Sequence, residues 1–339
     1  MSLVNEAFQG LPPSARSRVE RQLASGTRSS LFSAPAVAAA NSAGLTPIGE
    51  VFGCAVMRFG YAGTTCGWYG PPIPSQALNA ARASGHTTLT GGYQPGPESP
   101  IYLSGRGRYT AFTPYVKAFE AGWNRALERM LTEAHTLRAH GVVGIRLQRK
   151  LIEPEVWEFS ALGTAVRSTD VVIAPHLEDG AVWSTTLTAE DTASAILSGF
   201  IPREVLLGLA IATKHEDWQL MNQRSSWDNQ EIEGMSKLIQ AARHDARSKL
   251  EARATRSPGG QIVITDMELH EFVSPCGGSR DYHAEARVVG TTLVPVPRFR
   301  PPTSAHVSAV VSLRDRRFVR HEPADVMTGQ PLVRELDPG

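Results

Sequence analysis

The stretch from Tyr115 to Val166 decides the fold; it reads YVKAFEAGWNRALERMLTEAHTLRAHGVVGIRLQRKLIEPEVWEFSALGTAV. Apolar residues in its first half recur every three or four positions, which is typical of a helix with one buried side. We expect Thr113 to be the N-cap, Pro114 to lie in the first turn and Gly141 to form a left-handed C-terminal cap. The apolar stripe comprises Val116, Phe119, Trp123, Leu127, Met130, Leu131, Ala134 and Leu137.

The period changes from helical to strand-like after this helix. Val143, Ile145 and Leu147 alternate with small or polar residues, which indicates a half-buried strand. The segment EPE at 153–155 breaks that strand, and a second alternating strand follows at 157–161. A helix followed by a hairpin predicts a two-layer unit, in which the helical stripe covers one face of the sheet.

Three pieces of this stretch resemble the YbjQ-type domain in their order and spacing: RALERMLTEA (125–134), HGVVGIRL (140–147) and WEFSALGTAV (157–166). The resemblance implies a small strand–helix–strand–strand fold, dodecin-like in outline, that assembles into rings reported as pentamers. The family carries a heavy-metal-binding label, and its cellular function is not established.

A second copy of the unit is indicated later in the chain. The segment at 187–212 aligns with the segment at 32–57 at a constant offset of 155, so that Gly44 matches Gly199, Pro47 matches Pro202 and Val51 matches Leu206. A second helix is expected at about 229–254, followed by strands in QIVITDMELHEF and YHAEARVVGTTLV, with Gly290 at the place of Gly163. The fold class predicted is therefore α+β, with two tandem strand–helix–strand–strand units, each a small antiparallel sheet with one long helix.

The expected organisation has five parts. They are an N-terminal arm at 1–30, a first domain at 31–167 with a Gly/Pro-rich insertion at 61–112, a linker at 168–186, a second and divergent domain at 187–295, and a C-terminal extension at 296–339. Within the arm, Ser14–Leu23 is expected to be a short basic helix that is solvated or acts as a clasp. Within the insertion, Thr87–Thr90 and Ile101–Leu103 are weak strand candidates.

Composition excludes several classes of function. The 339 residues carry a formal net charge of +1, so no basic excess points to nucleic acid as a partner. No apolar run approaches the ~20 residues of a membrane helix, and the N-terminus lacks the apolar core of a signal peptide, so membrane insertion is not expected. Three scattered cysteines argue against a disulfide framework and favour a cytoplasmic location.

The candidates for chemistry are weak. Cys54, Cys66 and Cys276 form no CxxC, and the only metal candidates are Cys54 and His283, in a site assembled across subunits. The simpler interpretation is that the cysteines are buried small hydrophobes and the histidines are surface residues, with no cofactor; the alternative is a divalent or heavy-metal ion. Asp281 and His283 lie two residues apart at a predicted strand start and share one face, with Ser279 nearby; they are interpreted as a turn rather than a catalytic triad. No GxSxG or P-loop motif occurs, so no catalytic residue is predicted.

Assembly is the stronger expectation. One helix on a three-stranded sheet makes a marginal core and leaves two open edges. The segments VFGCAVM (51–57) and LLGLAIA (206–212) are apolar on both faces, so each needs a cover on two sides. Inter-unit or inter-subunit packing supplies it, and the expected assembly residues are Val51, Ala55, Leu206 and Ala210.

Three functional hypotheses follow. The first is a non-enzymatic, self-assembling cytoplasmic protein that pairs with itself in a pentameric ring or larger closed shell, with unknown cargo. The second is a heavy-metal-binding or metal-sensing protein. The third is a small-molecule-binding oligomer that uses inter-subunit pockets and the aromatic residues of the insertion, which are Trp68, Tyr69, Tyr93 and Tyr109.

Overall fold

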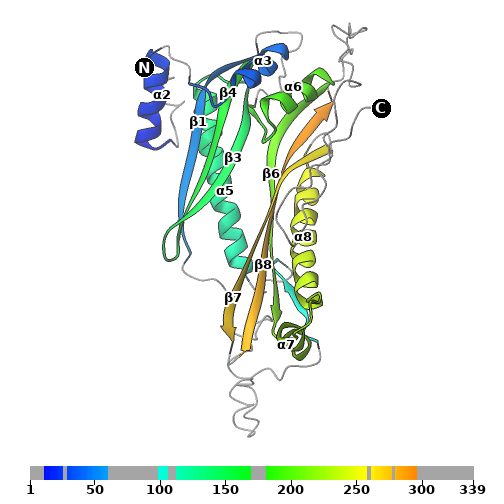
Figure 1. Cartoon of the computed structure of the whole chain (residues 1–339). Coiled ribbons are helices and arrows are strands. Elements are labelled where there is room, and N and C mark those ends of the chain that lie inside the picture. Colours follow the sequence, from blue (N-terminus) through cyan, green and yellow to red (C-terminus); the bar gives the residue numbers. More distant parts are fainter. Residues whose placement is uncertain are drawn as a thin grey trace, which may run out of the picture. The chain divides into compact units, whose positions relative to one another are not determined.

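The computed structural model describes residues 11–25, 29–59, 98–105, 112–168, 181–257, 261–276 and 279–295. They form an α+β fold with two four-stranded sheets, whose strand orders are β1-β4-β3-β5 and β2-β6-β8-β7 (Figure 1). Within these residues, no helix combines the length and the apolar character needed to cross a bilayer.

The first half contributes most of the first sheet. The helix α2 (Pro13–Ser25) precedes the elements α3 (Ala34–Ser42), β1 (Leu45–Arg58), α5 (Thr113–Thr136), β3 (Gly141–Glu153) and β4 (Val156–Ser168). The short strand β5 (Trp183–Ser184) runs parallel to β3 and closes the first sheet. Between β1 and α5 lies β2 (Ile101–Leu103), which was expected from the sequence; the other candidate, Thr87–Thr90, lies outside the described residues.

The second half repeats this order. It consists of α6 (Ala189–Leu197), β6 (Phe200–His215), α7 (Trp218–Ser225), α8 (Glu233–Ala254), β7 (Gln261–Cys276) and β8 (Ser279–Pro295). In both halves the last strand lies between the first and the middle strand of the unit, and both pairings are antiparallel. The short α7 was not expected, and β2, although it lies in the insertion of the first half, pairs with β6 of the second.

Matched glycines explain why the halves adopt one geometry. Gly44 and Gly199 both take positive φ, of 71° and 87°, directly after the short helix. A Cβ at Gly53 would lie 1.9 Å from the carbonyl oxygen of Ala126, and a Cβ at Gly208 would lie 2.1 Å from that of Ala246. The absence of a side chain thus lets the long helix rest directly on the first strand at the same place in each half.

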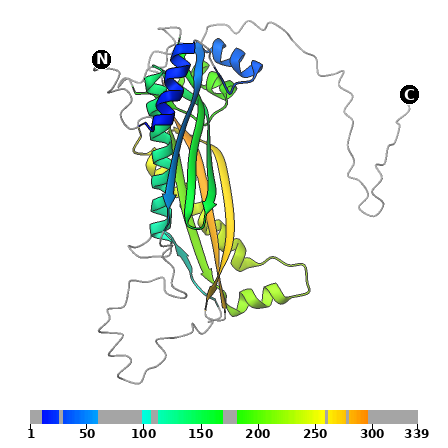
Figure 2. The same cartoon turned by 90° about the vertical axis from the view of Figure 1, so that its left-hand side faces the viewer.

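The helix α5 lies between the two sheets, and α8 covers the far face of the second (Figures 1 and 2). The largest core cluster joins Val51 of β1 and Phe119 of α5 to alternate residues of β6, which are Val205, Leu207, Leu209 and Ile211. The intervening residues Ala210 and Ala212 face α8. The sheet of the second half is therefore covered on one face by α8 and on the other by the first half. Packing between the two units was one of the two alternatives expected for the second cover of LLGLAIA (206–212).

Two helix-end predictions were wrong. Phe112 is the N-cap of α5, in a left-handed conformation, and Thr113 is the first helical residue, because its hydroxyl accepts a hydrogen bond from the N–H of Gly105 instead. Gly141 begins β3 rather than capping α5; the left-handed residue after the helix is Arg138. Gly141 is needed because a Cβ there would lie 2.0 Å from the indole of Trp183.

Candidate functional site

The outer edge of β1 is closed by side chains rather than by another strand. Gln22 and Arg18 of α2 donate to the carbonyl oxygens of Glu50 and Phe52, and the carboxylate of Glu133 accepts the N–H of Phe52 at 2.7 Å. Arg129 of α5 donates to the carbonyl of Cys54. These are the backbone groups that a neighbouring strand would use, so no further strand can pair here while α2 stays in place.

A buried charge lies at the centre of this closure. Burial raises the pKa of Glu133, although the N–H of Phe52 and the guanidinium of Arg18 both lower it. Arg18 forms the ion pair that compensates this carboxylate and also lies over the ring of Phe52. The helix α2 is therefore a clasp held by charge, not a solvated arm.

The outer edge of β6 is closed at the corresponding positions. Lys249 donates to the carbonyl of Leu209 at 3.0 Å, and Arg253 donates to that of Leu207. Ser104 pairs with Ile211 through both backbone and side chain, which extends the short pairing with β2.

The other two edges differ from each other. Beyond its pairing with β5, β3 is covered by the second sheet, where Arg149 forms an ion pair with Glu285 and Arg287 donates to the carbonyl of Leu147. Burial raises the pKa of Glu285, and Arg149 opposes that rise. Along β7, in contrast, the described residues supply strand pairing on one side alone, by β8. Its outer edge is the long uncapped one within the described part of the chain.

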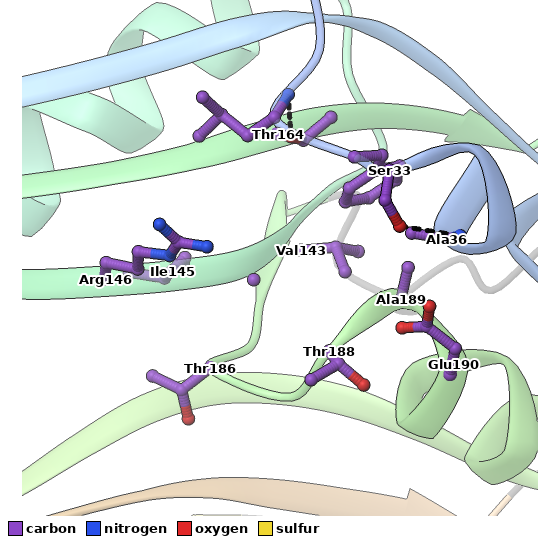
Figure 3. A pocket seen from close by; sticks show the side chains of 13 residues that line it. Ser33, Ala36, Val143, Ile145, Arg146, Thr164, Thr186, Thr188, Ala189 and Glu190 are labelled. Atoms are coloured by element: carbon purple, nitrogen blue, oxygen red, sulfur yellow. Dashed lines mark hydrogen bonds between the residues drawn. The ribbon is translucent and has the colours of Figure 1, made fainter.

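A pocket of about 280 Å³ lies where the two short helices begin (Figure 3). Ser33 and Thr188 cap these helices by accepting N–H bonds from Ala36 and Asp191. Arg146 and Glu190 also line the pocket and bring opposite charges to it. Because the N-cap side chains already satisfy helix N–H groups and the lining carries both signs of charge, the pocket favours no one class of ligand.

A dense polar cluster lies where β6 meets α7. The buried ammonium of Lys214 contacts the carboxylate of Asp217 at 2.6 Å and the carbonyl of Ser99 at 2.8 Å. Burial alone would raise the pKa of Asp217, but Lys214 and the N–H groups of Ser99 and Leu220 lower it overall. The hydroxyl of Ser99 donates to the carbonyl of His215. With its hydroxyl and its lysine neighbour both engaged, Ser99 anchors the insertion to the second sheet and is not arranged as a nucleophile.

Asp281 and His283 lie within β8, which confirms the strand start expected there and corrects the interpretation of the two residues as a turn. Asp281 bonds to His215 at 2.6 Å, while the two ring nitrogens of His283 lie 3.0 Å from the hydroxyl of Thr213 and 2.8 Å from that of Ser274. Both histidines are buried, which also corrects the expectation of surface histidines. No sequence signal marked this for His283, because Asp281, His283 and Glu285 alternate with apolar residues, as the solvated face of a strand does. Burial lowers the pKa of His283 to about 4, with Asp281 opposing the shift.

The two candidate metal ligands have other partners. Cys54 on β1 is half-buried and lies 3.3 Å from a carboxylate oxygen of Glu158, and burial followed by that contact raises its pKa to about 11. His283 is fully buried between the rings of Phe112 and Phe272. The described residues contain no group of three or more ligand side chains that could hold a metal ion. Cys66 lies outside the described residues.

The expected assembly residues lie mostly inside the chain itself. Val51, Ala55 and Ala210 are buried beneath α5 or α8, and Leu206 is half-buried against the α8 cluster. The expectation that β1 is covered on both faces was wrong, because Val56 is exposed and Phe52 and Cys54 are half-buried on its second face. A contact with another chain would therefore use other surfaces.

The chain is similar to known proteins in two respects. The family described as "Putative heavy-metal-binding" matches residues 107–169, which contain α5, β3 and β4. The second half is not part of that match. No solved structure matches the chain significantly.

One curated relative extends the likeness. "Encapsulin nanocompartment protein Rv1762c" of Mycobacterium tuberculosis (strain ATCC 25618 / H37Rv) is 31% identical over 156 residues. The match covers 45% of this chain and 59% of the relative, so it spans under two thirds of that protein. The chain is thus similar to a protein named for a nanocompartment and, over its first long helix and the hairpin after it, to a family labelled for heavy metals.

Proposed function

We propose that this protein is a non-enzymatic subunit that assembles with itself, in the cytoplasm, into a pentameric ring or a larger closed shell. The observation that carries the proposal is the 31% identity to an encapsulin nanocompartment protein. That name describes the relative, and it supports assembly here because such a compartment is built from many chains.

The surface of the described residues agrees with this function. One long strand edge is uncapped, and apolar side chains stand exposed at several places. Leu151 and Ile152 lie at the end of β3, and Trp218 of α7 and Trp227 are exposed near each other in the sequence. Contiguous apolar patches mark surfaces that bind other proteins, whereas scattered residues do not, so the uncapped strand edge is the stronger of these two observations.

We also propose that the second half is a divergent second copy of the YbjQ-type domain. The shared strand order, the glycines at 53 and 208, and the helix positions 129 and 249 that both cap the first strand support a duplication. A chain with two such units presents one ring-forming element twice.

The family label keeps metal binding as the alternative. In this function Cys54 and His283 would each need ligands from elsewhere, because neither belongs to a metal-ligand group within the described residues. Metal analysis of protein purified without a histidine tag tests it, and stoichiometric zinc or copper that survives dialysis would favour this alternative. A small-molecule role for the aromatic residues of the insertion would be supported by a ligand that co-purifies.

Light scattering on tag-free protein tests the assembly proposal directly. We expect a mass several times the 36.6 kDa of one chain at micromolar concentration, and closed particles in electron micrographs. A mass of one chain under those conditions would overturn it.

A further inference from the structure

Within the described residues, β7 differs from the other outer strands because no strand or side chain hydrogen-bonds to the backbone of its outer edge. The edges of β1, β3 and β6 are closed by Glu133 and Arg18, by the second sheet, and by Lys249 and Arg253. No described residue closes the outer edge of β7 in this way. From Gln261 to Cys276 the strand is paired with β8 on its other side alone. A long uncapped edge is a template for another strand.

The edge also carries exposed apolar side chains. Val263, Met267 and Val273 are 38%, 44% and 52% exposed, although Met267 and Val273 lie on the sheet face that α8 covers elsewhere. Met267 and Val273 lie within the regularly paired part of the strand, after the irregularity at 264–266, and Val263 precedes that irregularity. A strand laid along this edge would bury them.

The charges of β7 restrict how two copies can pair. Its acidic residues are Asp266, Glu268 and Glu271, and all three are exposed. Two identical antiparallel strands related by a twofold axis oppose residues whose numbers have an even sum, because opposed side chains lie on one face. When the axis passes at Leu269, Glu268 opposes His270 of the other copy; when it passes at His270, Glu268 opposes Phe272. In both registers no acid opposes an acid.

We propose that the outer edge of β7 pairs antiparallel with β7 of a second copy of this chain, about a twofold axis at Leu269 or His270. This inference rests on the proposed self-assembly and names one twofold contact within it; a ring or shell needs a second, heterologous contact elsewhere on the chain. The pairing joins the second sheets of two chains into one eight-stranded sheet. It leaves β1 closed by α2, so strand pairing between chains is confined to the β7 edge.

Replacement of His270 tests the pairing in both registers at once. In His270→Glu the new carboxylate opposes Glu268 or its own counterpart in the other copy, and like charges directly opposite each other destabilise paired strands. We expect the concentration of half-dissociation of the twofold contact to rise severalfold, up to about tenfold where two like-charge pairs form. His270→Gln keeps the size without the charge and is expected to assemble as the wild type does.

Hydrogen exchange separates loss of pairing from loss of folding, which matters because His270 lies near the buried Glu285. In assembled wild-type protein the amides of 266–274 should be protected, and in His270→Glu they should exchange faster while those of α8 remain protected. If the wild type is an oligomer and His270→Glu leaves both its mass and its β7 exchange unchanged, the β7 contact is wrong and the assembly proposal stands. If the wild type is a monomer, both fail.

Discussion

The two halves of the chain close the edge of their first strand from the same helix positions, with a cation in both at Arg129 and Lys249 but with opposite charges at Glu133 and Arg253. In the first half Glu133 accepts an N–H from β1, and in the second half Arg253 donates to a carbonyl of β6. Glu133 is compensated by Arg18 of the N-terminal helix, whereas Arg253 forms an ion pair with Glu120 of α5 at 2.9 Å. The sign of one residue thus decides whether an edge recruits a separate helix or the other half of the chain.

The difference matters because a buried charge needs a partner. A carboxylate at 133 makes the clasp necessary, and the clasp in turn blocks β1. An arginine at 253 instead couples the second helix to the first half without an added element. Three experiments separate what the halves share from what distinguishes them.

The largest effect is expected where the halves agree. Gly53→Ala and Gly208→Ala would each place a methyl group against a helix carbonyl that cannot move without the helix, at 1.9 and 2.1 Å. We expect each to lower the free energy of unfolding by about 4 kcal/mol or more, as severe overpacking does. Gly49→Ala is the control, because its nearest neighbour is a leucine methyl at 3.4 Å.

Chemical denaturation of the three variants measures this. If one of the two glycines tolerates alanine while the other does not, the close approach of helix and strand is not a shared feature of the halves.

A smaller effect is expected where the halves differ. Arg18→Met leaves the buried Glu133 without its ion pair and should cost about 3 kcal/mol. The second change Glu133→Gln should recover most of that loss, because the amide oxygen still accepts the N–H of Phe52 without a charge. Arg253→Met should cost less, since Glu120 keeps 19% of its side chain exposed whereas Glu133 keeps 1%.

The measurement is the free energy of unfolding of Arg18→Met, Arg253→Met and the double variant. Equal losses in the two single variants, or no recovery in the double variant, would contradict the account of the clasp as compensation for a buried charge.

The smallest effect is a pH dependence that comes from a buried histidine of the second half, His283, which the first half lacks. The position of His283 corresponds to Val156 in the first half when Gly290 is matched with Gly163. Burial lowers the pKa of His283 from 6.5 to about 4, so the unfolded chain binds the proton first as the pH falls. Its contribution is complete above pH ~6.5 and is lost as the pH falls toward 4, by about 2 kcal/mol at pH 5.

Comparison of wild type with His283→Gln at pH 7 and pH 5 checks this, because other titrating groups are common to both. The variant should lose less stability between the two pH values. An identical loss in both proteins would show that His283 is charged or solvated in the folded state.

Much of the fold followed from the sequence. The apolar period of 116–137 and the alternation after it determined a helix and a hairpin, and the offset of 155 located a second short helix and strand. These signals are local, because one helix or strand buries one face of its own residues. The turn at 153–155 and the strand at Ile101–Leu103 were found for the same reason.

Only the tertiary structure decided which side chains close the edges and which edge stays open. No local pattern identifies Arg18 as the partner of Glu133, because 115 residues separate them. Likewise, no local pattern shows that the indole of Trp183 packs directly against the backbone of Gly141. The histidines of β6 and β8 were misjudged because polar residues in a strand do not reveal whether another layer covers them. The residues expected at a subunit contact lie inside the chain for a related reason. The sequence shows that β6 needs a covering layer on each face, but only the fold shows that α8 and α5 provide both layers.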